Sequence, residues 1–306
     1  MSKSETPRGL RAGVATMLLA GVSNQTGSGI GALAFPAIGP AGVVAVRQLV
    51  AAVVLLPVAR PPLRRMTWAQ WWPSILLAAV FGVMNLSLYT AIERIGLGLA
   101  VTLEFLGPLA VALVSSRTRF DMLTAAAASV GVYVLVLPGP SSDLIGIGSG
   151  LLAAACWAAY ILLNRIAGAR LPGLQAPAVA SGLTAIAYMP VAVTLALQGR
   201  LVGMPLLYAF AAGVLASVVP YAADLTALRY VPKQLFGVFM SVHPVLAGVA
   251  GVVLLGQVLV AREWAGIAIV VLANVAAVAL GARRRSSQPS GDAVLTHAPT
   301  VVLPAA

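Results

Sequence analysis

Ten apolar runs of about 20 residues recur along the chain, and this repetition constrains the fold more than any other feature. A helix of that length crosses a hydrocarbon core about 30 Å thick. The runs are apolar throughout, whereas strands of a membrane β-barrel alternate apolar and polar residues, so helices are favoured. The predicted spans are Ala12–Ala34, Ala37–Ala59, Trp72–Ile92, Leu97–Val114, Met122–Pro138, Ile147–Leu163, Gln175–Leu197, Met204–Leu228, Leu235–Leu255 and Trp264–Leu280.

The composition agrees with an all-α membrane protein. Hydrophobic residues make up 60% of the 306 residues and charged residues only 9%, with a mean hydropathy of +0.98. A soluble domain carries about 25% charged residues, so an integral membrane protein is expected. The first run follows a basic start, as in a signal peptide, but it exceeds the roughly 7–15 apolar residues of such a peptide. It is therefore predicted to be a retained helix.

The basic residues are distributed unevenly between the loops. With the amino terminus in the cytoplasm, fifteen of the 19 Lys and Arg residues fall on the cytoplasmic side, and Arg47 falls within a span. Only Arg94, Arg200 and Arg262 fall on the opposite side. This bias predicts that both termini are cytoplasmic. The net charge of +11 is therefore expected to reflect topology and contact with anionic lipids, and not nucleic-acid binding.

Ten spans with both ends on one side divide into two sets of five that cross the membrane in opposite directions, an inverted repeat. The predicted divisions are a cytoplasmic segment at 1–11, five-helix repeats at 12–140 and 141–281, and a mobile cytoplasmic tail at 282–306. Prolines inside spans interrupt helical hydrogen bonding, so Pro108 and Pro244 are predicted structural hinges at matching points of the halves. A shift of 136 residues places Thr90, Ala91, Leu99 and Pro108 on Thr226, Ala227, Leu235 and Pro244.

Several stretches of the chain carry a family resemblance. The clearest is Met84–Leu113, MNLSLYTAIERIGLGLAVTLEFLGPLAVAL, and the others are Val44–Leu49 (VAVRQL), Ala155–Gly168 (ACWAAYILLNRIAG) and Phe236–Pro244 (FGVFMSVHP). Over roughly residues 10–282 the chain resembles the bacterial threonine and homoserine exporters, EamA-type members of the drug/metabolite transporter superfamily. The resemblance implies ten inner-membrane helices in two inverted repeats around a central substrate cavity. It also implies gradient-driven efflux of small metabolites, amino acids first.

Three charged side chains fall within predicted spans: Arg47, Glu104 and Asp224. A charge near the bilayer centre costs about 2.5–3.5 kcal/mol, so all three are candidates for substrate binding or proton coupling. Glu104 lies in the resembling motif, one helical turn before Pro108, and removal from water would favour its protonated form. The guanidinium of Arg47 can hold a substrate carboxylate through two bonds. The alternative for these two is a permanent Glu104–Arg47 ion pair that locks two helices.

Two further candidates accompany Asp224 in the eighth and ninth spans. Asp224 is near the cytoplasmic end of its span, three residues after Tyr221, and either lines the cavity or pairs with Arg229 at the interface. His243 lies mid-span, immediately before Pro244. Histidine changes its charge near neutral pH more readily than other side chains, which makes it a coupling candidate. The alternative is a neutral histidine that joins two helices through a hydrogen bond.

Polar and aromatic side chains at helical spacing complete the candidates. They are Gln25, Asn85, Tyr89, Trp157 and Tyr160, with Asn24 and Asn164 beside them. Each alone is expected to join helices at about 1 kcal/mol, but together they indicate a polar cavity among several helices. Cys156 is the single cysteine, which excludes an internal disulfide and a cysteine-cluster metal site. No metal or cofactor is expected.

These residues favour a secondary exporter of threonine- or homoserine-like amino acids that works by alternating access and is coupled to protons. The sequence has no GxxxxGK[ST] phosphate loop, so a gradient is the expected energy source. The first alternative is an exporter of another metabolite or drug class. An enzyme acting on a lipid-linked substrate is disfavoured because HExxH and GxSxG are absent, and a channel because no filter motif is present. The expected partners are a small-molecule substrate and anionic lipids, with a homodimer left open.

Overall fold

The computed structural model describes residues 7–114, 119–136, 143–220, 223 and 240–287. All regular elements within these residues are helices. The first half contains α1 (Pro7–Ala32), α2 (Phe35–Ala59), the 3-10 helix η2 (Leu63–Arg65), α3 (Trp68–Ile95), α4 (Leu97–Glu104), α5 (Leu106–Val114) and α6 (Arg119–Val136). The second half contains α7 (Leu144–Gly168), α8 (Gln175–Leu197), α9 (Gly203–Gly213), the π-helical turn η3 (Val214–Val218), α12 (His243–Leu255) and α13 (Ala261–Ser287).

Most helices agree with the predicted spans, and the all-α class is confirmed for the described residues. The helix α8 coincides with the predicted Gln175–Leu197, and α2 begins two residues before the predicted Ala37. The helix α13 extends through Ser287, beyond the predicted start of the tail at residue 282. Within the described ranges, α2, α3, α7 and α8 are each long and apolar enough to cross a membrane. Shorter apolar helices cover Leu97–Val111, Met122–Val136, Gly203–Val218 and His243–Leu255.

Two predicted spans are interrupted close to Pro108 and Pro244, the prolines that were predicted to act as hinges. The chain breaks at Phe105 between α4 and α5, and the turn residues Ser241 and Val242 precede α12. Each break begins three residues before a proline, Pro108 in one case and Pro244 in the other. Proline has no amide proton and clashes with the carbonyl four residues earlier, so a regular helix cannot pass through. The shift of 136 residues places one break on the other.

The helices pack in contacts that recur between the halves. The helix α2 lies along α8, α4 along α12, and α6 along α13. The other large contacts form matched sets: α3 packs on α7 as α9 packs on α1, α4 on α7 as α12 on α1, and α3 on α8 as α9 on α2. Where α4 crosses α12 the backbones nearly touch, since a Cβ added to Gly98 would lie 3.0 Å from Cα of Gly248.

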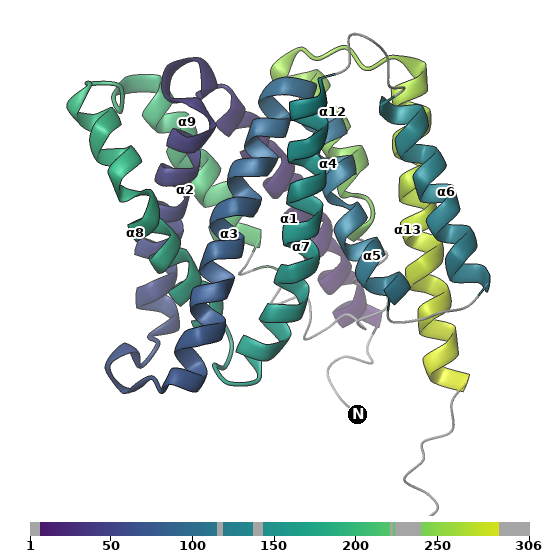
Figure 1. Ribbon diagram of the computed structural model, residues 1–306, viewed down its shortest axis with the longest axis horizontal. Helices are drawn as coiled ribbons and strands as arrows, with labels where there is room; N and C mark the ends of the chain where they lie inside the picture. Colours follow the sequence, from purple (N-terminus) through teal and green to yellow (C-terminus); the bar gives the residue numbers. More distant parts are fainter. Residues whose placement is uncertain (1–6, 115–118, 137–142, 221–222, 224–239, 288–306) are drawn as a thin grey trace, which may run out of the picture.

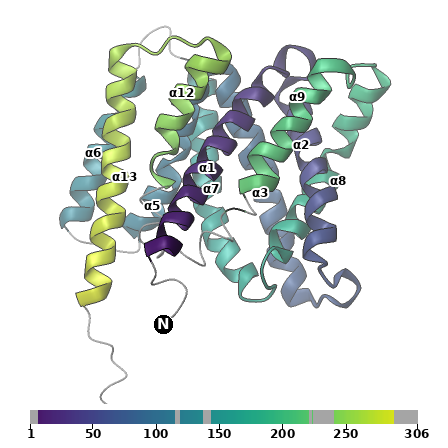
Figure 2. The same cartoon turned by 180° about the vertical axis from the view of Figure 1, so that it is seen from behind.

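The helix ends define two faces of the molecule. The start of α1 and the end of α13 lie at the same face, the lower one in Figures 1 and 2, together with the α2–α3 and α7–α8 connections. The α1–α2, α8–α9 and α12–α13 connections lie at the opposite, upper face. There Asp143 accepts a hydrogen bond of 2.8 Å from the Gly146 amide and pairs with Arg94 at 3.1 Å. The Gly146 amide, with help from Arg94, holds the pKa of the Asp143 carboxyl below its usual value.

Candidate functional site

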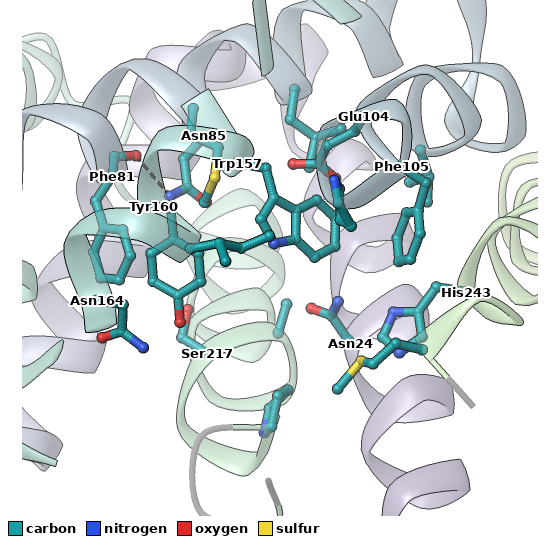
Figure 3. A pocket seen from close by; sticks show the side chains of 18 of the residues that line it. Asn24, Phe81, Asn85, Glu104, Phe105, Trp157, Tyr160, Asn164, Ser217 and His243 are labelled. Carbon is teal, nitrogen blue, oxygen red and sulfur yellow. Dashed lines mark hydrogen bonds between the residues drawn. The ribbon is translucent and has the colours of Figure 1, made fainter. Parts of the chain in front are cut away.

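A cavity of about 540 Å³ is lined by side chains from both halves. Its walls come from α1, α2, α3, α4, α5, α7, α8, η3, α12 and α13, and Figure 3 shows polar and aromatic side chains converging on it. Seven predicted site residues line this one space, together with the predicted hinge Pro108. They are Gln25, Arg47, Asn85, Glu104, Trp157, Tyr160 and His243.

The cavity reaches toward the lower face. Gly168, Gly173 and Leu174, at or next to the α7–α8 connection, belong to its lining. Toward the upper face the space between the halves is filled by buried apolar side chains, among them Phe35 and Leu97. The cavity therefore extends toward the face where α1 begins, and a layer of packed apolar side chains separates it from the opposite face.

Arg47 is held by three neutral groups. Its Nε donates to Oγ of Ser217 at 2.8 Å, its Nη1 to Oη of Tyr89 at 3.2 Å, and its Nη2 to the carbonyl of Ala216 at 2.7 Å. The guanidinium carbon also lies 5.5 Å from the centre of the Tyr89 ring. Arg47 is buried, and no carboxylate of the described residues is within ion-pair distance of it. A guanidinium has five N–H groups, so two N–H groups of this cavity-lining side chain take no part in these three bonds.

The carbonyl that Arg47 contacts is available because of Pro220. In an α-helix the carbonyl of Ala216 would accept from the amide of residue 220, and in a π-turn the carbonyl of Leu215 would accept from the same residue. Proline has no amide proton, so residue 220 cannot supply either of these bonds. Arg47 donates to Ala216, and Oγ of Ser23 donates to Leu215 at 2.8 Å. The position of Pro220 thus creates the acceptor for Arg47.

Glu104 is the last residue of α4, where its side chain is only 5% exposed. Pro108 removes the amide that the backbone carbonyl of Glu104 would accept from, so polar groups concentrate at this level. Figure 3 shows Glu104, Asn85 and Trp157 directed into the same space from α4, α3 and α7. Across the described residues, no ion pair or hydrogen bond joins the Glu104 carboxylate to a partner, Arg47 included. A direct Glu104–Arg47 ion pair is therefore not part of this structure.

Phe105 and His243 connect the two interrupted spans. The Phe105 ring makes an edge-to-face contact with Trp157, with centroids 4.6 Å apart, and lies 5.5 Å from the His243 ring. Nδ1 of His243 is 3.2 Å from Nε2 of Gln25, so a hydrogen bond joins α12 to α1. Oε1 of Gln25 is buried and has no hydrogen-bond partner in the described structure. His243 therefore both lines the cavity and joins two helices.

The remaining predicted residues divide between the cavity wall and the layer behind it. Asn85 donates to the carbonyl of Phe81 at 2.8 Å, and the Tyr160 ring lies 5.4 Å from the Phe81 ring. Asn24 and Asn164 also line the cavity. Tyr89 is fully buried and contacts Arg47 instead of lining the cavity.

Some candidates do not meet the cavity in the described structure. Asp224 and Tyr221 lie outside the described residues. Pro244, the second residue of α12, is buried but does not line the cavity. In the part of the chain that the structure covers, no cluster of three or more His, Cys, Asp or Glu side chains is placed to hold a metal ion.

Sequence reasoning missed three groups at this site: Ser217, the carbonyl of Ala216, and Phe105. A signal for the second was present, because a proline four residues after Ala216 leaves its carbonyl without the helical donor. Phe105 was recognisable only as the residue before a predicted break. Nothing in the sequence separates Ser217 from other small residues in apolar helices.

Comparisons with known proteins give one consistent result. The model of the EamA-like transporter family matches residues 144–278. The threonine/homoserine exporter RhtA of Salmonella typhimurium is 35% identical over 271 residues, which cover 88% of this chain and 90% of the relative. The threonine/homoserine exporter RhtA of Escherichia coli K12 is 32% identical over 265 residues, covering 86% of this chain and 90% of the relative.

A solved crystal structure, described only as that of a protein, has the same fold. It matches with a TM-score of 0.56 at 20% sequence identity, over 90% of this chain and 99% of the other.

Proposed function

We propose that this chain, which belongs to the EamA-like transporter family, is a secondary exporter of threonine, homoserine or related small zwitterionic amino acids. It is a multi-pass inner-membrane transporter and not an enzyme. The observation that carries the proposal is the pair of opposite charges in one cavity. Among the described residues, no carboxylate lies within ion-pair distance of Arg47 and no cation within ion-pair distance of Glu104. A zwitterion offers both missing charges.

The proposed transport cycle is alternating access by two inverted five-helix repeats. The matched helix contacts of the two halves support this architecture, as do the breaks at Phe105 and Ser241, which the shift of 136 residues brings into register. Both breaks place the amino terminus of a half-helix, α5 or α12, at the level of the cavity. Such interrupted helices are typical of substrate sites in inverted-repeat transporters.

The lower face is proposed to be cytoplasmic. Arg60, Arg64, Arg65 and Arg170 lie in or beside the two connections at that face, whereas Arg94, Arg200 and Arg262 lie in or beside connections at the other. The positive-inside rule then places α1's start and α13's end in the cytoplasm, where basic residues contact anionic lipids. The cavity would accordingly be open toward the cytoplasm, ready to load an exported substrate.

Glu104 is proposed as the proton-coupling residue. Its carboxylate is nearly excluded from solvent and has no hydrogen-bond donor among the described residues, which disfavours the charged form. A proton or a substrate ammonium group would each neutralise it. Alternation between these two occupants couples proton entry to amino-acid exit.

Glu104→Gln in proteoliposomes tests this role. Wild-type protein is expected to release labelled threonine faster when protons flow inward, whereas the glutamine variant should lose that acceleration because it cannot bind a proton. Glu93→Gln, at an exposed position of α3, is the matched control and should behave like wild type. An unchanged rate with unchanged response to the pH gradient would remove Glu104 from the coupling mechanism.

The substrate class is tested in cells. Cells that express the chain should tolerate raised external threonine and homoserine better than cells carrying an empty vector. Equal sensitivity across a panel of amino acids would eliminate this substrate class. The alternative, an exporter of a different metabolite or drug class, would then be the better description.

A further inference from the structure

Arg47 is held in place by three hydrogen bonds to buried groups. Its three donors reach acceptors on two other elements, α3 (Tyr89) and η3 (Ala216 and Ser217). All three acceptors are buried, with Ser217 3% exposed and Tyr89 0%. The orientation of the guanidinium plane is therefore set by buried groups of the protein, of which Tyr89 lies outside the cavity lining.

The Tyr89 hydroxyl is itself held in place. The Phe35 ring packs against the Tyr89 ring at a centroid distance of 5.6 Å and an interplanar angle of 85°. On the other side α1 approaches closely, because a Cβ added to Gly31 would lie 3.3 Å from Oη of Tyr89. Tyr89 therefore gives Nη1 of Arg47 an acceptor whose position is determined by rigid packing.

We propose that Ser217 and Tyr89 are positioning residues that aim the two remaining N–H groups of Arg47 at a ligand carboxylate, and so make the cavity select ligands that carry one. The argument is geometric. An arginine fork discriminates a planar carboxylate from a neutral group only when its orientation is fixed. Three hydrogen bonds fix this one, and two N–H groups remain on a side chain that lines the cavity. This inference depends on the proposed function only for the identity of the ligand that carries the carboxylate.

The test compares amino acids with their amino alcohols, which keep the ammonium group and lack the carboxylate. The melting temperature of purified protein is measured against concentrations of threonine, threoninol, phenylalanine and phenylalaninol, since a ligand stabilises the state that it binds. In wild type the half-saturating concentration of each amino acid should lie at least about tenfold below that of its alcohol. Ser217→Ala should raise the value for the amino acids about tenfold and leave that for the alcohols unchanged.

Two variants and one control sharpen the result. Ser217→Thr keeps the hydroxyl and should restore the wild-type preference, and Tyr89→Phe should weaken the preference as Ser217→Ala does. Ser181→Ala is the matched control, because Oγ of this fully buried serine on α8 has no hydrogen-bond partner among the described residues. It should leave the preference unchanged.

The inference is overturned if wild type binds both members of each pair equally or neither of them. It is also overturned if Ser217→Ala weakens both members to the same extent, since a purely structural role would do that. Transport is measured separately. If wild-type proteoliposomes export neither threonine nor homoserine, the proposed substrate class fails, while the preference between paired ligands still decides the role of Ser217.

Discussion

The contact between α2 and η3 resembles the contact between α8 and α3, since in each a side chain donates to a backbone carbonyl of the other helix. Only the first contact holds a charged side chain, Arg47, that lines the cavity. In the first, Arg47 donates to the carbonyl of Ala216 across 2.7 Å. In the second, Oγ1 of Thr184 donates to the carbonyl of Ala78 across 2.9 Å. The shift of 136 residues that aligns the halves places Arg47 next to the position of Thr184 and Ala216 two residues from Ala78. Corresponding helix pairs thus carry a cation in one half and a hydroxyl in the other.

The difference between these contacts follows from one residue in the helix that supplies the acceptor carbonyl, Pro220 in one half and Met84 in the other. Pro220 stands four residues after Ala216, whereas the same shift places Met84 opposite Pro220. Methionine has an amide proton, so α3 continues as a regular helix through this level, and the Ala78 carbonyl keeps the amide of Gly82 as its helical donor. Proline has none, so the Ala216 carbonyl loses its α-helical donor, and it accepts from Arg47 next to the π-helical turn η3. A side-chain donor is therefore optional for the carbonyl of Ala78, whereas the carbonyl of Ala216 depends on Arg47.

The largest expected effect comes from changing Arg47, the donor on which the carbonyl of Ala216 depends. Arg47→Lys keeps the charge but replaces a planar fork by a single ammonium group, which cannot reach three acceptors in fixed geometry. We expect transport to fall at least about a hundredfold and stability to fall by about 2 kcal/mol, because buried acceptors lose their donors. Transport in proteoliposomes and thermal unfolding in detergent measure the two effects.

A second arginine provides the control for Arg47→Lys. Arg94 pairs with Asp143 at a partly exposed position, where a salt bridge contributes little. Arg94→Lys should therefore leave transport within twofold, roughly, of wild type. If Arg47→Lys were equally mild, charge alone would matter and the distinction between required and optional donors would be wrong.

Replacing Pro220 would make the contact at Ala216 resemble the contact at Ala78, in which the side-chain donor is optional. Pro220→Met restores an amide proton, so the carbonyl of Ala216 can accept a hydrogen bond within its own helix. Arg47 must then compete with that amide for the carbonyl. We expect transport to fall about tenfold while stability stays equal or rises, by up to about 3 kcal/mol. Pro190→Met on an exposed face of α8 is the matched control and should leave transport unchanged. Loss of stability with full transport would contradict the role assigned to Pro220.

The sequence predicted the helices better than the contacts between them. The span at Gln175–Leu197 needed only apolar length, and the breaks near Pro108 and Pro244 had a local cause in the missing amide. Arg47 and Glu104 were found because a charge is costly inside an apolar helix. Each of these signals is carried by neighbouring residues and can be read locally.

The partners of Arg47 could not be predicted in the same way. Ala216 and Ser217 are 169 and 170 residues away from it, and the contacts depend on how α2 packs against η3. Pairing of opposite charges suggested Glu104, but burial of a cation is also satisfied by neutral acceptors. Tyr89 was predicted to line the cavity from its spacing to Asn85, yet it contacts Arg47 and does not line the cavity. Helical spacing shows which residues share a face but not how closely a neighbouring helix covers that face.

The smallest expected effect comes from the optional donor. Thr184→Val on α8 removes the hydroxyl that contacts Ala78 and, at 2.9 Å, the carbonyl of Ala180, but neither carbonyl depends on that hydroxyl for its helical bond. We expect a loss of about 1 kcal/mol in the free energy of unfolding and transport within about twofold of wild type. Thr194→Val, an exposed position on the same helix whose hydroxyl bonds only the carbonyl of Pro190, should cost less still. A transport defect in Thr184→Val as large as that of Pro220→Met would mean that both halves position the ligand, and that the asymmetry created by Pro220 is not what defines the site.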